Sequence, residues 1–146
     1  MDTKGVITVE FILTSMAFLI LTSGILTLVS ERMDTVSSTK ELGNARMISK
    51  NLAESINKVY NGGNGHKIVL DLPSISDSDY WIKVNFSGTF VLIDGMIGKT
   101  SINPKKISNS DDLKESTVSM HADHNYVIKN VEDSNGNNWI VINEIK

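Results

Sequence analysis

The order of apolar and polar residues divides the chain into three stretches. The first, from Val6 to Ser30, is apolar apart from short polar residues and one ionisable side chain, Glu10. Residues 31–61 are mostly polar, with apolar positions three and four residues apart. From His66 onward, short segments alternate between apolar and polar residues. The pattern predicts an apolar helix, an amphipathic helix and a region rich in strands.

The apolar segment is long enough to cross a membrane. As a helix that rises about 1.5 Å per residue it spans about 37 Å, which covers a bilayer core with some tilt. Its serines and threonines do not break the helix, because a hydroxyl can bond a backbone carbonyl one turn earlier. Lys4 precedes the segment and no basic residue follows until Arg32, which favours a cytoplasmic N-terminus. We expect a single-pass membrane protein with residues 31–146 outside the cell.

The polar stretch that follows predicts a helix with one buried face. Low helix propensity in residues 35–39 and at Gly43 predicts a bend or a melted turn near residues 35–44. The glycines of residues 61–65 are typical of a helix C-terminus. The apolar positions recur at helical spacing: Ala45, Ile48, Leu52, Ile56 and Val59.

The remaining chain predicts strands. Residues 66–72 form one, stopped by Pro73, and residues 80–86 form another that turns at Ser87-Gly88 into residues 89–93. A second hairpin joins residues 125–131 and 138–145, and residues 94–117 read as an irregular exposed connection. Four alternate residues share one face of the second strand: Tyr80, Ile82, Val84 and Phe86. The expected fold class is α+β, a helix packed across an antiparallel sheet of four or five strands.

The composition limits the chemistry of the outer part. The chain has 146 residues, no cysteine and a formal net charge of −3 at pH 7. Beyond one spanning segment about 115 residues remain, enough for one modest domain. Without cysteine there is no disulfide, thiolate metal site or cysteine nucleophile. The nearly balanced charge gives no electrostatic footprint for nucleic acid, so we expect no nucleic-acid binding.

Glu10, the one ionisable residue of the apolar segment, needs an explanation. A carboxylate inside a spanning helix costs a few kcal/mol and marks function, which calls for a partner. If a peptidase cut after Gly5, Val6 would carry a new α-ammonium and Glu10 would be the fifth residue of the mature chain. A neighbouring subunit could then place its amine against this carboxylate, so that the two charges are buried as a pair.

These residues resemble the class III signal peptide of type IV pilin-like proteins. The resemblance covers roughly the first 30 residues, with a short leader ending in Lys-Gly before an apolar helix. Archaeal pilins look closest, since they commonly read Gly-Gln-x-Ser-x-Glu-Phe. Gly5, Thr8 in place of Ser, Glu10 and Phe11 match that motif, while Val6 stands where Gln is usual. Bacterial pilins, pseudopilins and tight-adherence pilins therefore stay open.

The resemblance implies a function. Residues 1–5 would be a leader that a prepilin peptidase removes after Gly5, and Glu10, with Thr8 and Phe11, would act in assembly with other pilin subunits. The helix of residues 6–30 would anchor the protein in the membrane and later form the core of a cell-surface filament. Residues 31–61 would continue this helix, and residues 66–146 would form the extracellular β-rich domain of a pilin-like lollipop.

Two alternatives remain. An uncleaved signal anchor would hold a single extracellular binding module on the membrane, and a minor pseudopilin would serve a secretion system. A conventional secretory signal fits less well, because the apolar segment exceeds the usual length and no small-x-small site ends it.

Other candidate sites are weaker. Asn85-Phe86-Ser87 is a sequence for N-glycosylation at a predicted hairpin tip. His121-x-Asp123-His124 contains residue types that bind metals, but no second cluster of ligands is recognisable elsewhere in the sequence. A polar turn is therefore the preferred interpretation.

The turn of the last predicted hairpin contains residue types that bind calcium. Asp133, Asn135 and Asn137 alternate as calcium ligands do, but the glycine position favours a hairpin turn.

Asp111-Asp112 reads as solvated charge in a loop. The sequence contains no catalytic triad and no phosphate-binding loop, so we expect no enzyme, no resident metal and no cofactor.

Overall fold

The computed structural model describes the backbone of residues 3–72 and 80–145, and the side chains of residues 8–72 and 80–145. Its contacts divide the chain into two compact units, Met1–Thr39 and Lys40–Lys146. One helix, α1 (Thr3–Asn61), contributes to both units. The predicted strand stop at Pro73 lies outside the described residues.

The bend that we expected near residues 35–44 is wrong, because this stretch is helical in α1. The hydroxyl of Thr35 donates to the Glu31 carbonyl at 2.9 Å, and that of Thr39 donates to the Thr35 carbonyl at 2.8 Å. Such bonds lie along the helix and are compatible with it, so local propensity does not decide the conformation here. The helix also begins at Thr3, three residues before the predicted start at Val6.

The predicted C-terminus of the helix is confirmed. α1 ends at Asn61, and Gly63 has a φ of 78°, which glycine adopts without strain. The Gly62 N–H donates to the Lys58 carbonyl at 3.0 Å and closes the last turn. The buried Asn130 adds a side-chain cap, because its Nδ2 donates to the Tyr60 carbonyl at 3.0 Å.

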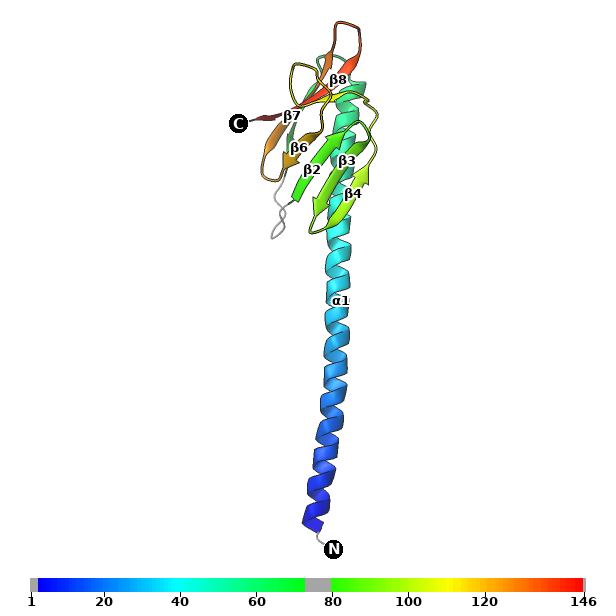
Figure 1. Cartoon of the computed structure of the whole chain (residues 1–146), viewed down its shortest axis with the longest axis vertical. Coiled ribbons are helices and arrows are strands. Elements are labelled where there is room, and N and C mark those ends of the chain that lie inside the picture. Colours follow the sequence, from blue (N-terminus) through cyan, green and yellow to red (C-terminus); the bar gives the residue numbers. More distant parts are fainter. Residues whose placement is uncertain (1–2, 73–79, 146) are drawn as a thin grey trace. The chain divides into compact units, whose positions relative to one another are not determined.

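Eight strands follow in the described part of the second unit, several of which are labelled in Figure 1. They form two four-stranded sheets, ordered β1-β7-β8-β5 and β4-β3-β2-β6, and β5 pairs with β8 in parallel. The α+β class with its long helix and mainly antiparallel strands is confirmed, but the strands form two sheets and not the single sheet of four or five strands that we expected. The strands are β1 (Lys67–Asp71), β2 (Tyr80–Asn85), β3 (Gly88–Ile93), β4 (Met96–Thr100), β5 (Ile107–Ser108), β6 (Val118–His121), β7 (Asn125–Glu132) and β8 (Asn138–Ile145).

The interpretation of residues 94–117 as an irregular exposed connection is also wrong. This stretch contributes β4 and β5, and the side chains of Ile102 and Ile107 are buried. Strand β4 passes close to the helix at Gly98, where an added Cβ would collide with the Ala45 backbone. Gly98 interrupts the alternation of apolar and polar residues in β4, and β5 has only two residues. Neither strand therefore shows a pattern that the sequence alone reveals.

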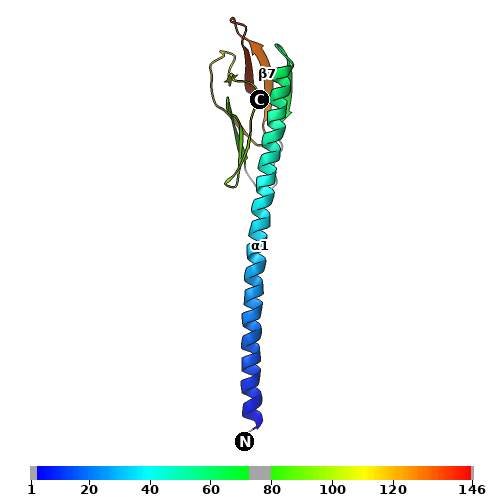
Figure 2. The ribbon, with the colours of Figure 1, turned by 90° about the vertical axis from the view of Figure 1, so that its right-hand side faces the viewer.

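The apolar face predicted for the helix is confirmed, since all five of its residues are buried in the core. Figure 2 shows the last turns of α1 beside the strands of this unit. Tyr80, Ile82 and Val84 are buried on one face of β2 as predicted, but Phe86 is 55% exposed. The pairing of Asn85 with Gly88 explains this difference, because it leaves Phe86 in the two-residue turn.

Candidate functional site

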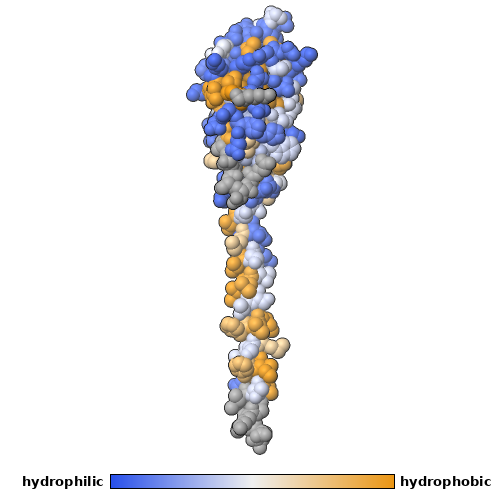
Figure 3. Space-filling model, turned by 90° about the vertical axis from the view of Figure 1, so that its left-hand side faces the viewer, coloured by the Kyte–Doolittle hydropathy of each residue, from blue (hydrophilic) through white to orange (hydrophobic). Residues whose placement is uncertain are grey.

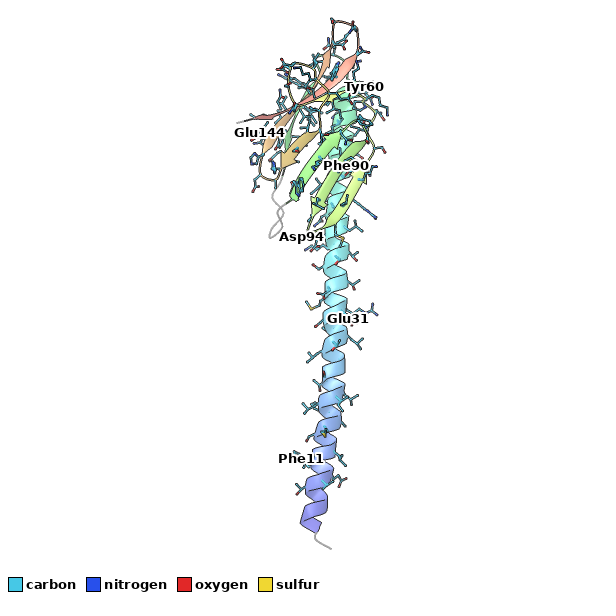
Figure 4. All side chains as sticks on the ribbon, viewed as in Figure 1. Phe11, Glu31, Tyr60, Phe90, Asp94 and Glu144 are labelled. Atoms are coloured by element: carbon cyan, nitrogen blue, oxygen red, sulfur yellow. The ribbon has the colours of Figure 1, made fainter. Side chains whose placement is uncertain are left out.

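The N-terminal part of α1 exposes apolar side chains on all its faces. Phe11 is 72% exposed and is labelled in Figure 4, and orange apolar residues cover much of this helix in Figure 3. A helix that is apolar all round is suited to lipid or to other helices rather than to water. Within the described residues, α1 is the helix that is long and apolar enough to cross a membrane.

Three hydroxyl groups of this segment bond within the helix. Thr14 donates to the Glu10 carbonyl at 2.7 Å, Ser15 to the Phe11 carbonyl at 2.8 Å, and Thr22 to the Phe18 carbonyl at 2.8 Å. For these three residues, the bonds confirm the expectation that a hydroxyl can bond a backbone carbonyl one turn earlier. They leave the side chain of Glu10 as the strongly polar group of the segment.

The Glu10 side chain is exposed, and among the residues whose side chains are described no cation pairs with it. The next basic residue along α1 is Arg32, several turns away. In hydrocarbon this carboxylate would need a positive partner from elsewhere, because an unpaired charge is costly there. Thr8 and Phe11 lie on the same helical stretch, within one turn of Glu10.

The predicted cleavage site lies in the same helix. The backbone at Gly5 and Val6 is helical, while their side chains, with Met1 and Asp2, lie outside the described residues. Val6 precedes Glu10 by four residues, which corresponds to a rise of about 6 Å along the axis. A molecule shifted by about one turn along a parallel neighbour would therefore bring its residue 6 level with this carboxylate.

The candidate glycosylation residue Asn85 ends β2 at the tip of a hairpin. Its Oδ1 accepts a hydrogen bond from the Ser87 N–H at 2.9 Å, and the neighbouring Phe86 is exposed. The sequon therefore lies in a tight turn at the surface, as predicted.

The candidate metal ligands around residue 121 lie at the end of a strand and in the turn that follows it. His121 ends β6, Asp123 lies in the following turn with a φ of 58°, and His124 is hydrogen-bonded to Glu144, with 2.7 Å between Nδ1 and Oε1. Over the described residues, no group of three or more acidic, histidine or cysteine side chains is arranged to hold a metal ion. Asp123 lies in a turn, as the polar-turn interpretation predicted.

Asp133 organises the turn between β7 and β8. Its carboxylate accepts hydrogen bonds from Trp139 Nε1 at 3.0 Å and from the backbone N–H groups of Asn137 and Asn135, each at 2.9 Å. These bonds, the Trp139 bond foremost, hold the pKa of the Asp133 carboxyl well below its usual range. Lys106 Nζ adds an ion pair at 3.5 Å. The predicted hairpin is confirmed, because β7 and β8 pair antiparallel on either side of this turn.

Asp111 and Asp112 were predicted to be solvated charges, and one of them, Asp111, has a charged partner. Asp111 forms an ion pair with Lys129 of β7, and its carboxylate is largely exposed. This pair ties the loop to a strand.

Sequence analysis missed an aromatic and cationic surface on the outer face of the sheet β4-β3-β2-β6. Lys83 Nζ lies 4.7 Å from the centre of the Trp81 ring, and Lys99 Nζ lies 5.0 Å from that of Phe90. Trp81, Lys83 and Phe90 line a shallow groove of about 320 Å³, together with Ile97. The alternation of residues 81, 83 and 85 in β2 was the signal that could have indicated it, since odd positions face away from the buried Ile82 and Val84.

Comparisons with known proteins give no relative for this chain: no protein-family model, no curated protein and no solved structure matches it. The assignment of a function therefore rests on the residues and their geometry.

Proposed function

We propose that the chain is a structural subunit of a type IV pilus-like surface filament, cleaved by a prepilin peptidase after Gly5 and assembled through its N-terminal helix. The observation that carries the proposal is Glu10, an exposed acid within an apolar helix, without a cationic partner among the described side chains. In the membrane the helix anchors one molecule, and in the filament it packs against the helices of its neighbours. The second unit is then carried outside the cell.

The pairing of Glu10 with the new amine of a neighbouring Val6 gives assembly its register. Each charge alone is costly in an apolar surrounding, whereas the pair is tolerated when the geometry is good. Removal of one partner leaves the other unpaired, with a penalty of about 3–5 kcal/mol in buried settings. Register and assembly therefore depend on a peptidase that frees the amine.

The first test is the mass of the N-terminal peptide from the natural cell. We expect mass spectrometry to find a mature chain that begins at Val6. A mature chain that retains residues 1–5 in assembled material would overturn the proposal.

The second test uses Glu10→Ala, with Glu31→Ala as a matched control on the same helix but outside the apolar segment. We expect normal cleavage in both variants, and a loss of about ten-fold or more in sheared filaments for Glu10→Ala alone. Equal filament yields for the two variants would contradict the role of Glu10.

A second candidate function is a membrane-anchored binding module, and the groove around Trp81 and Phe90 is the observation that favours it. In that case the apolar helix is only an anchor. Replacement of residues 6–30 by an unrelated membrane helix separates the two functions. A module keeps its binding activity after this exchange, whereas a filament subunit loses assembly.

A further inference from the structure

Strand β1 is an edge strand. It pairs with β7 on one side, and no other strand in the described part of the chain pairs with it on the other. An edge of this kind presents unpaired backbone N–H and C=O groups to any strand that approaches it.

The register of β1 shows which residues face the free edge. The Leu72 N–H donates to the His124 carbonyl at 3.3 Å, and the Asn130 N–H donates to the His66 carbonyl at 2.9 Å. Even-numbered residues of this ladder therefore turn their backbone groups toward β7, because the groups alternate in antiparallel pairs. Those of Lys67, Val69 and Asp71 turn toward the free edge.

The same three residues carry the exposed side chains of the strand. The exposure alternates along β1, and Val69 is 63% exposed although it is apolar. Lys67 and Asp71 flank it at equal distances, and neither forms an ion pair with a described residue. Along the free edge the side chains are thus positive at Lys67, apolar at Val69 and negative at Asp71.

This order is complementary to itself when the strand is reversed. If two copies pair antiparallel with Val69 opposite Val69, each Lys67 lies opposite the other copy's Asp71. Each of these opposed pairs exchanges two backbone hydrogen bonds, because all three residues point their groups to the edge. A lysine on an edge strand normally discourages pairing, but in this register it meets an aspartate on the same face.

We propose that β1 is a docking surface for a second copy of this chain, which it binds through antiparallel β1–β1 pairing centred on Val69. The contact is isologous and closes on itself, so it joins two molecules and does not extend a filament. If the chain polymerises through its apolar helix, the edge connects subunits of different filaments. The pairing itself requires neither cleavage at Gly5 nor polymerisation.

Cysteine cross-linking tests the proposal on the full chain, since the protein contains no cysteine of its own. Opposed residues of a hydrogen-bonded antiparallel pair have Cα atoms about 5.5 Å apart, within the range for a disulfide. Val69→Cys is compared with Ile97→Cys, an apolar residue of the edge strand β4 that is 61% exposed. Both proteins are oxidised in non-ionic detergent with the leader intact.

We expect Val69→Cys to form the covalent dimer about ten-fold faster than Ile97→Cys, because only the first residue faces itself across the proposed two-fold axis. Equal rates would overturn the proposal. This outcome would leave the proposed filament function untouched, because that function is tested by cleavage and by Glu10.

A charge exchange tests the register. In the Val69→Cys background, we expect Lys67→Asp alone and Asp71→Lys alone to slow cross-linking about three- to ten-fold, since each places like charges opposite one another. The double exchange restores the opposed charges and should restore the rate. A double variant that stays as slow as the single variants would refute the pairing.

If a charge variant loses its native circular dichroism spectrum, salt replaces it as the test. Raising the salt concentration screens exposed charge pairs, so cross-linking of Val69→Cys should slow while that of Ile97→Cys should not. An equal response of the two proteins counts against the proposal.

Discussion

Gly98 of β4 lies so close to the backbone of Ala45 in α1 that no side chain fits between them. The groups that a Cβ would meet are the Ala45 carbonyl and the Arg46 nitrogen, and neither can rotate away. We expect Gly98→Ala to destabilise the second unit by about 3 kcal/mol, because the helix and the strand must move apart. Urea unfolding followed by the fluorescence of Trp81 and Trp139 reports on this unit.

Gly43→Ala is the control for that prediction. Gly43 also lies in α1, and an added Cβ meets nothing within 4 Å. Alanine there should stabilise the helix by about 0.5–1 kcal/mol, since it restricts the unfolded chain. Changes of the same sign in both variants would contradict the close approach at Gly98.

Asn130 joins the end of the helix to strand β7. Its buried amide donates to the carbonyls of Tyr60 and Val59 at 3.0 and 3.4 Å, in the last turn of α1. We expect Asn130→Ala to cost about 1–3 kcal/mol, because it leaves buried carbonyls without a donor. Asn51→Ala, at an exposed position of the same helix, should change the urea midpoint little. Equal midpoints for the two variants would show that the cap is unimportant.

Periodicity in the sequence predicted those parts of the fold in which one element repeats a pattern several times. The buried face from Ala45 to Val59 extends over four turns, and the alternation in β2 was visible for the same reason. Strands β4 and β5 were missed because they are stabilised by pairing with distant strands and by contact with the helix. Gly98 and Lys99 interrupt β4 with residues that are depleted in strands, and β5 is only two residues long.

The candidate sites differ in the same way. Glu10 was found because a single acid in an apolar segment is visible in one dimension. The groove beside Trp81 and Phe90 depends on the register of β2 and β3, and the partner of Asp133 depends on how the hairpin returns Trp139 to it. No local rule of sequence predicts such cross-strand neighbours before the pairing is known.

Asp133 should make the second unit sensitive to acid. Its carboxyl has a lowered pKa in the folded state, so the folded state favours the charged form. Its contribution to stability is complete above the unfolded pKa, near 3.8, and is lost as the pH falls toward the lower folded value. We expect Asp133→Asn to lower the melting temperature by several degrees at neutral pH and by progressively less below about pH 4.

Asp111→Asn is the control for that experiment, because Asp111 is a largely exposed acid paired with Lys129. We expect little change in its melting temperature at neutral pH, as is usual for exposed ion pairs. A melting temperature of Asp133→Asn that matches the unaltered chain at neutral pH would show that the carboxylate does not hold the turn.

Tyr80 should limit stability at alkaline pH. Burial, with smaller contributions from the negative charges of Asp123 and Asp71, raises its pKa from 10.0 to about 12. The unfolded chain therefore ionises first, and stability present below pH 10 falls as the pH rises toward about 12. We expect a loss on the order of 1–2 kcal/mol over this range. Unfolding by urea at several alkaline pH values measures this loss, and Tyr80→Phe should remove it. An equally steep decline in that variant would assign the alkaline sensitivity to other groups.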